Sequence, residues 1–483
     1  MKKLVFAACL LWISGLALLC SDDKKAHAME GSGTEAEPYI IKTPEDLSDI
    51  RNDMGAYYKL GADIDLAGYD YDGAGPDTGG WKPIGNSSFN AFTGTLDGNG
   101  FAILNMTINR PDENYVGLFG WVGHNGKLVN IRLLDVNVIG RSTAGSLAGI
   151  LNGTLEDVYS TGRVQALTDH AGGLVGSSSG GTIRNSFAAV DVTTPHRAGG
   201  LAGINQGVIE NVFAVGSVRG NDEVGGLVGY NAQAPSGQVV IQNAYAAGKV
   251  TGNVLTGGLI GRFFDGATVE HAFWNTETSG QSSSARGTGI TTEQMKDADT
   301  FAAWDPAVWG FHDGKTFPYL LSFPLAIGVD PLVPTTYGLH PGQDALSVTG
   351  SIHHHSAGEP INVRYVIRDD AGVVVEEHAE VLTSDGNGDL PIKRKFWLSA
   401  LTFDDGDYTL TITATDTRHA VAGITLGFTV DTAAPAPPSV VFGTNGQEVW
   451  AQTASTSVTV YDSGSGVDAS SLQYAWSPDP VTP

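Results

Sequence analysis

Cysteine, basic residues and long apolar runs are scarce in this 483-residue chain. Its two cysteines, Cys9 and Cys20, lie within the first 20 residues, so a disulfide framework or a cysteine-based zinc site downstream is excluded. Lysine and arginine number 27 against 52 aspartates and glutamates, which gives a net charge of −25. This balance argues against nucleic acid and against an anionic membrane as partners, because binding phosphate groups requires a basic surface.

The one long apolar run, residues 4–19, follows a basic Lys2-Lys3 pair. It is too short for a spanning helix and has the layout of a secretory signal peptide. Residues 26–28 (Ala-His-Ala) fit the small-x-small cleavage rule. We therefore expect a signal peptide over 1–28, cleaved near Ala28, and a secreted or extracellular protein with no transmembrane segment in the mature chain.

A lipoprotein alternative would attach the lipid to Cys20. The preceding Leu18-Leu19 fits it poorly, because lipoprotein cleavage sites carry a small residue there. Removal of 1–28 takes away both cysteines, four lysines and two aspartates, so the net charge deepens to −27. The exported chain would then fold without disulfides, as suits a bacterial extracellular protein.

Glycine is abundant, with 64 residues, and much of it lies in a recurring Gly-Gly-Leu-x-Gly motif. The motif stands at 172–176, 199–203, 225–229 and 257–261, with looser copies at 117–120 and 145–149. Successive leucines are 26 to 32 residues apart. These structural leucines are Leu118, Leu147, Leu174, Leu201, Leu227 and Leu259.

A second pattern follows each leucine: an aliphatic residue, any residue, a polar residue, and an aromatic residue two positions later. The polar members are Asn130, Asp157, Asn185, Asn211 and Asn243. The aromatic members are Tyr159, Phe187, Phe213, Tyr245 and Phe273.

Each repeat holds short runs with strand character and cannot bury a core by itself. Stacking the repeats in register would bury one continuous core and pair each backbone edge with the next coil. Glycine at the strand junctions would permit sharp corners. The predicted fold class is therefore all-β, with a parallel β-solenoid (β-helix).

The repeat resembles the GLUG motif, which is found in large bacterial surface and secreted proteins. The flanks resemble the same family at residues 81–85 (Trp-Lys-Pro-Ile-Gly), 92–100 and 273–281. The resemblance covers residues 37–325, and it implies a surface module rather than a known reaction.

Both ends of the solenoid need caps, because an open end would template aggregation. Thr43, Pro44 and Asp46 form a capping-box-like start of a short helix, and a second helix is expected over 291–304. We predict an N-terminal cap with first coils over 29–116, GLUG-like repeats over 117–280 and a C-terminal cap over 281–332.

Beyond the repeats the pattern changes to alternating strands of a different β domain. Ile361, Val363, Tyr365 and Ile367 would face one side of one strand, and Tyr408, Leu410, Ile412 and Ala414 one side of another. Residues 405–416 resemble the penultimate strand of bacterial immunoglobulin-like sandwiches. We expect an Ig-like β-sandwich over 333–432, a Pro-rich linker over 433–438 and a partial, truncated second Ig-like module over 439–483.

The aromatic members of the repeat are the ligand-binding candidates: exposed, they would form a ladder on which sugars stack. Each aromatic residue stands an even number of positions after the inward-facing aliphatic residue of its repeat. Strand alternation would place both on the same side, and this favours burial of the aromatic rings in a corner of the core instead.

Catalytic residues are not expected. β-Solenoids also host polysaccharide-cleaving enzymes, whose chemistry needs paired carboxylates. Glu156, Glu210 and Glu270 share one column, but Arg184 and Gln242 interrupt it. The carboxylates would then lie about 9–10 Å apart, two coils distant.

Metal candidates are weak. Asp70, Asp72 and Asp77, and separately Asp385, Asn387 and Asp389, offer oxygen ligands for a structural Ca²⁺. The second set fails the EF-hand pattern because position twelve is Phe396, and a hairpin turn is favoured. The run His353-His354-His355 has no accompanying ligand cluster in the sequence, so a solvated strand end is favoured. No other cofactor is expected.

The sequence therefore indicates a secreted or cell-surface, non-enzymatic bacterial protein. It would be an adhesion or interaction rod of GLUG repeats on Ig-like spacers, binding a cell-surface glycan or protein. The alternative is a polysaccharide-acting β-helix enzyme or a carbohydrate-binding accessory module.

Overall fold

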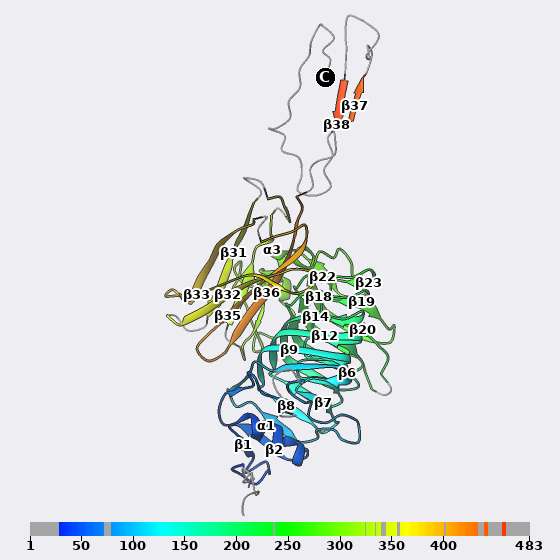
Figure 1. Ribbon diagram of the computed structural model, residues 1–483, viewed down its shortest axis with the longest axis vertical. Helices are drawn as coiled ribbons and strands as arrows, with labels where there is room; N and C mark the ends of the chain where they lie inside the picture. The colour runs from blue at the N-terminus through cyan, green and yellow to red at the C-terminus, as the bar shows by residue number, and fades with distance from the viewer. Residues whose placement is uncertain are drawn as a thin grey trace, which may run out of the picture.

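The computed structural model describes residues 29–71, 79–234, 237–323, 325–333, 335–339, 344–354, 358–399, 402–432, 439–442 and 456–459. The predicted signal peptide over 1–28 and linker over 433–438 lie outside these ranges. Of the predicted module over 439–483, only the antiparallel strands β37 (Ser439–Phe442) and β38 (Thr456–Thr459) are described. The main body consists of a solenoid and a two-sheet domain beside it (Figure 1).

The solenoid is built from parallel strands in two sheets. The six-stranded sheet contributes one strand to each of six coils, in the order β24-β20-β16-β13-β10-β7. Its strands are β7 (Phe119–Val122), β10 (Ala148–Leu151), β13 (Val175–Ser178), β16 (Ala202–Asn205), β20 (Val228–Asn231) and β24 (Ile260–Phe263). The predicted all-β class and parallel solenoid are confirmed.

The twenty-stranded sheet forms the rest of the wall. Its strands are β1 (Tyr39–Ile41), β2 (Tyr57–Leu60), β3 (Ile64–Asp65), β4 (Thr95–Asp97), β5 (Ala102–Leu104), β6 (Thr107–Val116), β8 (Lys127–Val129), β9 (Arg132–Ala144), β11 (Thr154–Glu156), β12 (Tyr159–Gly172), β14 (Thr182–Thr193), β15 (His196–Gly199), β17 (Val208–Ala214), β18 (Val218–Arg219), β19 (Asp222–Gly225), β21 (Val240–Ala246), β22 (Val250–Thr251), β23 (Val254–Gly257), β25 (Thr268–Asn275) and β26 (Thr288–Ile290).

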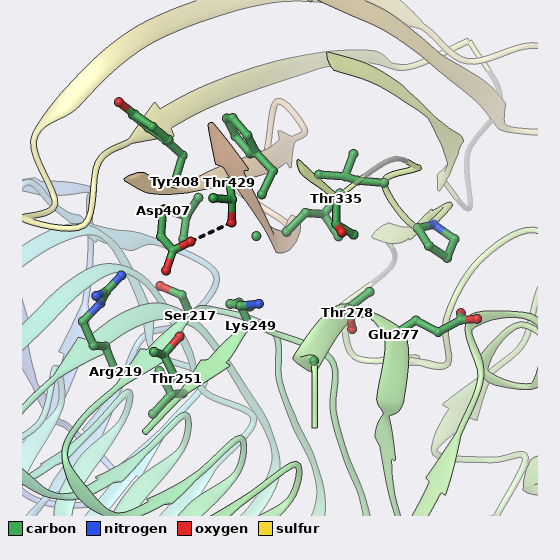
Figure 2. Close-up of a pocket in the computed structure, with 18 residues that line it drawn as sticks. Ser217, Arg219, Lys249, Thr251, Glu277, Thr278, Thr335, Asp407, Tyr408 and Thr429 are labelled. Atoms are coloured by element: carbon green, nitrogen blue, oxygen red, sulfur yellow. Dashed lines mark hydrogen bonds between the residues drawn. The ribbon is translucent and has the colours of Figure 1, made fainter. Parts of the chain in front are cut away.

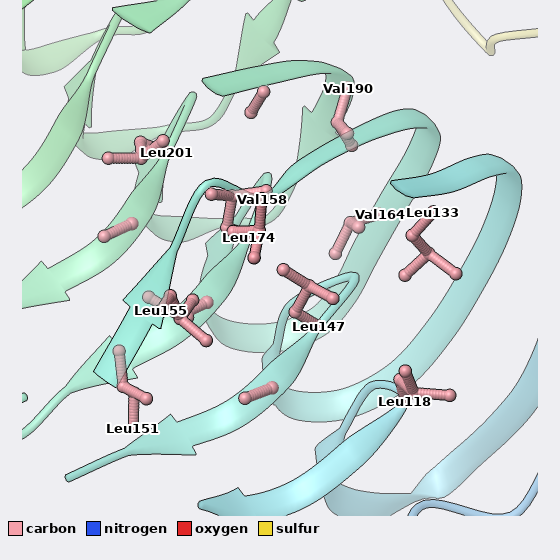
Figure 3. Packing of buried hydrophobic residues seen from close by; sticks show 14 of the residues in the cluster. Leu118, Leu133, Leu147, Leu151, Leu155, Val158, Val164, Leu174, Val190 and Leu201 are labelled. Carbon is pink, nitrogen blue, oxygen red and sulfur yellow. The ribbon is translucent and has the colours of Figure 1, made fainter. Parts of the chain in front are cut away.

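The repeat register is the one that the sequence indicates. Leu155 pairs with Leu128 of the preceding coil and with Ile183 of the next. All six motif leucines are fully buried. Figure 3 shows Leu118, Leu147, Leu174 and Leu201 pointing into the interior of successive coils. Coil stacking therefore builds the continuous apolar core that no single repeat could bury.

The polar column forms one corner of the solenoid. Asn130, Asp157, Asn185, Asn211 and Asn243 all have φ between 48° and 56°, the left-handed region that Asn and Asp tolerate best. The side-chain Nδ2 of Asn243 donates to Asn211 Oδ1 at 3.1 Å, and Nδ2 of Asn211 donates to Asn185 Oδ1 at 3.3 Å. The column therefore combines the required backbone conformation with a ladder of side-chain hydrogen bonds.

The motif glycines serve close approach rather than the corners. A Cβ on Gly200 would lie 2.1 Å from the carbonyl oxygen of Gly226, and one on Gly226 would lie 2.2 Å from that of Gly258. None of the three has a positive φ. This corrects the expectation that glycine makes the corners: the left-handed corner belongs to the polar column.

The N-terminal end carries the predicted capped helix, α1 (Pro44–Asp49), followed by the 3-10 helix η1 (Ile50–Asn52). Thr43 Oγ1 accepts from the Asp46 amide, and Asp46 Oδ2 accepts from the Thr43 amide at 3.0 Å. Leu47 is buried in the core of the first coils. The capping box thus places the helix over the N-terminal end.

The predicted helix over 291–304 is instead two short turns. The helix α3 (Thr292–Met295) is separated from the 3-10 helix η2 (Ala298–Phe301) at Asp297, whose side chain caps the second turn by accepting from the Asp299 amide. The helix α2 (Thr276–Ser279) precedes them, and the hairpin β27 (Trp309–Gly310) and β28 (Tyr319–Leu320) follows. Among the described residues, no helix combines the length and apolar character needed to cross a membrane.

The two-sheet domain begins earlier than predicted, at Leu325 rather than residue 333. One sheet has the order β29 (Leu325–Val329), β31 (Ala345–His354) and β34 (Asp389–Trp397). The other has the order β30 (Thr336–Tyr337), β36 (Val421–Val430), β35 (Gly406–Thr415), β32 (Pro360–Arg368) and β33 (Val374–Thr383). Both predicted apolar faces, on β32 and β35, are buried. The rings of Tyr365 and Phe396 meet between the sheets at 5.7 Å.

The two-sheet domain lies along the flank of the solenoid (Figure 1). The Thr425 amide of β36 donates to the Val215 carbonyl at 3.0 Å, and Arg163 of β12 donates to the Gly372 carbonyl at 2.9 Å. The solenoid and the two-sheet domain therefore form one packed body, and the domain is not a spacer attached end to end.

Candidate functional site

The aromatic column points outward from the solenoid. Adjacent rings stack almost in parallel: Tyr159 and Phe187 lie 4.8 Å apart, Phe187 and Phe213 4.5 Å, and Phe213 and Tyr245 4.9 Å, with interplanar angles of 4° to 6°. These four rings are nevertheless buried. They belong to the core shared with the two-sheet domain rather than to the solenoid interior.

The segment predicted as the C-terminal cap, 281–332, covers this column. Phe323 meets both Tyr159 and Phe187 edge-on, at 4.9 and 5.3 Å, and Trp309 contacts Phe213 and Tyr245. Residues 283–285 and β26 extend the last coil through backbone hydrogen bonds and strand pairing. Phe323 and Trp309, further along the segment, lie against the aromatic column. The four stacked rings are therefore unavailable for sugar stacking, and their burial is against a second module rather than in the predicted corner of the solenoid core.

Two phenols of the column are anchored by hydrogen bonds. The Tyr245 hydroxyl donates to the Pro318 carbonyl at 2.8 Å, and the Tyr159 hydroxyl donates to the His419 carbonyl. Burial raises the pKa of both tyrosines well above the usual value. Both therefore act as neutral donors: Tyr159 fixes the solenoid to the two-sheet domain, and Tyr245 fixes it to the segment that covers the column.

The fifth member of the column, Phe273, is only partly buried. Its ring meets Phe301 edge-on at 5.2 Å and lies 6.0 Å from Trp304. It thus continues the covered surface onto the last coil.

The carboxylate column has the predicted register. Glu156 pairs with Arg184 and Arg184 with Glu210, while Gln242 stands between Glu210 and Glu270. No two of these glutamates occupy neighbouring coils. Successive glutamates of the column are therefore two coil spacings apart, about 9–10 Å, as the sequence predicts. Glu156 and Glu210 are half-buried and Glu270 is exposed on the outer wall.

The first set of calcium candidates is only partly described by the structure. Asp72 and Asp77 lie outside the described residues. Asp385 Oδ1 accepts from the backbone amides of Asn387 and Asp389, both at 2.8 Å, in the tight turn that leads from β33 of one sheet to β34 of the other. A turn is present here as the sequence favoured, but it joins the two sheets rather than the strands of a hairpin. The Asp389 carboxylate has other partners.

Those partners form the one group of potential metal ligands among the described residues: His312, His353 and Asp389. Asp389 Oδ1 lies 2.8 Å from His312 Nε2 and 3.0 Å from His353 Nδ1, and Lys315 contacts Oδ2. Of the predicted histidine run, His353 takes part. His354 is buried, with its Nε2 3.1 Å from Asp416 Oδ2, and His355 lies outside the described residues.

Protonation in this group follows from its surroundings. Burial lowers the pKa of His312, and neighbouring His353 lowers it further. Burial opposes charge on Asp389, but hydrogen bonds from Lys315 and His353 outweigh it and lower the pKa of the carboxyl group. The group at neutral pH thus contains a carboxylate beside an uncharged His312 imidazole.

A cleft of about 420 Å³ lies between the solenoid and the two-sheet domain. Figure 2 shows Ser217, Arg219, Lys249 and Thr251 on the solenoid side, facing Asp407 and Thr429 of the two-sheet domain. We call this the interdomain cleft. Sequence reasoning did not find it, because its walls come from segments some 200 residues apart that no local motif connects.

The charged side chains of the interdomain cleft are unevenly hydrogen-bonded. The Asp407 carboxylate accepts from Thr429 Oγ1 at 2.7 Å, and the Glu277 carboxylate accepts from the Thr292 amide at 2.8 Å. Lys249 and Arg219 make no side-chain hydrogen bond or ion pair within the part of the chain that the structure describes. The stem of Lys249 packs on Gly427, where a Cβ would come within 2.7 Å of Lys249 Cδ. The cleft thus contains two cations without hydrogen-bond partners among the described residues, beside two hydrogen-bonded carboxylates and several hydroxyl groups.

The fold and repeats define a class: an all-β repeat protein with a parallel solenoid and a packed two-sheet domain. Residues 169–193, from the end of β12 through β14, match the family model described as the GLUG motif. The resemblance noted in the sequence is therefore shown for this repeat.

Two relatives are similar in sequence to part of this chain. Halomucin from Haloquadratum walsbyi is 39% identical over 164 residues, which is 33% of this chain and 2% of that protein. A protein named as a Gly-rich membrane protein from Evansella cellulosilytica is 41% identical over 133 residues, 26% of this chain and 15% of that protein. The chain thus spans only a small share of each relative's length.

Among solved structures, the enzymatically active domain of tailspike protein 4 from bacteriophage CBA120 aligns at 9% identity and a TM-score of 0.14. The alignment covers 80% of this chain and 66% of that one. A score this low carries no argument about fold or function.

Proposed function

We propose that this chain is a secreted or cell-surface, non-enzymatic interaction protein whose ligand site is the interdomain cleft. The ligand we propose is a cell-surface glycan that bears carboxylate groups. The observation that carries the proposal is the pair Lys249 and Arg219, which lack compensating partners in a chain of net charge −25. Charge-assisted hydrogen bonds to a carboxylate would satisfy both side chains.

The size and lining of the cleft support a saccharide ligand. Its volume of about 420 Å³ lies within the usual range for ligand pockets. Ser217, Thr251 and Thr429 contribute hydroxyl groups, which both donate and accept hydrogen bonds. Sugar hydroxyls have the same dual character, so these side chains match them.

A surface location is supported by the GLUG motif and by the names of the two relatives, Halomucin and a Gly-rich membrane protein. The strongly acidic composition is in keeping with an extracellular protein, and the sequence of 1–28 has the layout of a signal peptide.

We also propose that the two-sheet domain is immunoglobulin-like. Its sheets have three and five strands, with antiparallel neighbours except for β30 beside β36. The Tyr408 hydroxyl, near the start of the penultimate strand, donates to the Asp404 carbonyl at 2.9 Å and accepts from the Asp404 amide at 3.0 Å. A tyrosine corner of this kind is typical of immunoglobulin-like sandwiches.

The alternative is a polysaccharide-acting enzyme or a carbohydrate-binding accessory module. Hydrolysis would need two carboxylates facing one cleft, whereas both acidic groups of the interdomain cleft are held by hydrogen bonds within the protein.

The two functions separate in one experiment on residues 29–483. A glycan array identifies bound saccharides, and a reducing-sugar assay follows the same saccharides with time. Binding of uronate-containing glycans without release of reducing ends supports an interaction protein. Turnover that Glu210→Gln abolishes would establish the enzyme instead, and an array without bound glycans would contradict the glycan ligand.

A further inference from the structure

We propose that His312, His353 and Asp389 form a Zn²⁺ site that fixes the segment after the last coil to the two-sheet domain. His312 follows β27, His353 belongs to β31, and Asp389 begins β34. The site therefore joins three segments that are distant in the sequence, and neither the histidine run nor the aspartate-rich turn alone defines it.

The donor atoms already converge. Asp389 Oδ1 lies 2.8 Å from His312 Nε2 and 3.0 Å from His353 Nδ1, and the three ligand atoms lie within 4.8 Å of one another. In a tetrahedral zinc site with bonds of about 2.0–2.1 Å, neighbouring ligand atoms lie about 3.3 Å apart. Each imidazole nitrogen would move a few tenths of an ångström away from the carboxylate oxygen to admit the ion, and the two nitrogens already lie no more than 4.8 Å apart.

His312 supplies a second, independent observation. Its Nε2 is buried and makes no hydrogen bond of acceptable geometry among the described residues, although it faces the Asp389 carboxylate. Its ring stacks on that of His353, with centroids 4.1 Å apart and 17° between the planes. A bound cation would satisfy this nitrogen and hold both imidazoles.

The donor set favours zinc over calcium. Two imidazoles and one carboxylate suit zinc, whereas Ca²⁺ takes six to eight oxygen ligands. Lys315 contacts the other oxygen of Asp389 and so orients the carboxylate from outside the ligand set. The fourth tetrahedral position would be taken by water. This assigns Asp389 to zinc rather than to the calcium loop considered from sequence.

The test uses residues 29–483 without a polyhistidine tag, because tag imidazoles bind zinc. ZnCl₂ is titrated calorimetrically into wild type, His312→Ala, Asp389→Asn and the control His124→Ala, an exposed histidine outside the cluster. Circular dichroism and melting temperature establish that each variant is folded. CoCl₂ in place of zinc reports the coordination geometry through its visible absorption.

We expect one equivalent of Zn²⁺ to bind wild type and the control, with a rise in melting temperature and a tetrahedral cobalt spectrum. His312→Ala should weaken binding at least about tenfold. Asp389→Asn should weaken zinc binding to a similar extent. If this variant does not fold, the comparison of His312→Ala with wild type tests the proposal. No saturable binding to wild type, or equal binding in His312→Ala, would overturn the proposal.

Discussion

Phe187 and Phe213 lie face to face on adjacent coils, with ring centroids 4.5 Å apart and an angle of 4° between their planes. Phe187 also stacks on Tyr159 and meets Phe323 of the segment 281–332, the covering segment. This one ring thus contacts both neighbouring coils and the segment that leads into the two-sheet domain. Through these contacts the solenoid and the two-sheet domain share a core.

Phe187→Ala should destabilise the protein by about 3–5 kcal/mol, because it removes a buried ring and leaves a cavity. Urea unfolding followed by circular dichroism measures the change. The matched control is Phe89→Ala, since Phe89 is fully exposed; it should leave the free energy of unfolding nearly unchanged. Equal stability of the two variants would mean that the aromatic column is not packed as described.

Gly200→Ala should destabilise by about 2 kcal/mol or more, since its Cβ would lie 2.1 Å from the backbone carbonyl of the next coil. Gly55→Ala is the control, because the nearest heavy atom to its Cβ is 3.7 Å away. Thermal unfolding of both variants measures the difference. A Gly200→Ala protein as stable as Gly55→Ala would refute the close coil contact.

Asp157→Asn should stabilise the protein at neutral pH. Burial raises the pKa of Asp157 and nearby Glu156 raises it further, although a hydrogen bond from Ser322 partly opposes them. A carboxyl group whose pKa is raised on folding favours the folded state when protonated, and that contribution is lost as the pH rises through the raised pKa. The asparagine also suits the left-handed corner between Asn130 and Asn185.

The expected gain at pH 7 is below about 1 kcal/mol, because the group is partly exposed and solvent screens it. It should shrink as the pH falls towards 3.8, the ordinary pKa of the group. Denaturant unfolding at several pH values measures this dependence. A loss of stability at pH 7 would show that the charged carboxylate is needed at this corner.

The repeat columns were predictable because stacked coils place equivalent residues above one another. The leucine and asparagine columns need no information beyond the repeat period. Strand alternation did not predict which face of the solenoid wall the aromatic residues occupy. Asn185, which lies between Ile183 and Phe187, has a left-handed backbone conformation that turns the chain and reverses the alternation. Ile183 consequently faces the solenoid core, whereas Phe187 faces the covering segment.

A second left-handed column escaped prediction for a different reason. It consists of Tyr115, Thr143, His170, Arg197, Glu223 and Leu255, whose side chains share no chemistry. Glu223 in this column accepts from Arg197 at 2.7 Å and from Arg262 at 2.6 Å. The interdomain cleft and the zinc ligands likewise arise from packing between modules, which repeat periodicity does not encode.

The most direct test of a ligand site between the two modules is a calorimetric titration of residues 29–483 with a uronate-containing oligosaccharide bound on the array. Lys249→Met, which removes the charge but keeps the apolar stem, is compared with wild type and with Lys127→Met, an exposed lysine outside the cleft. We predict at least about a tenfold loss of affinity for Lys249→Met, as expected for a lost charge-assisted hydrogen bond, and unchanged affinity for Lys127→Met. Equal affinity of wild type and Lys249→Met would contradict a ligand site in the interdomain cleft.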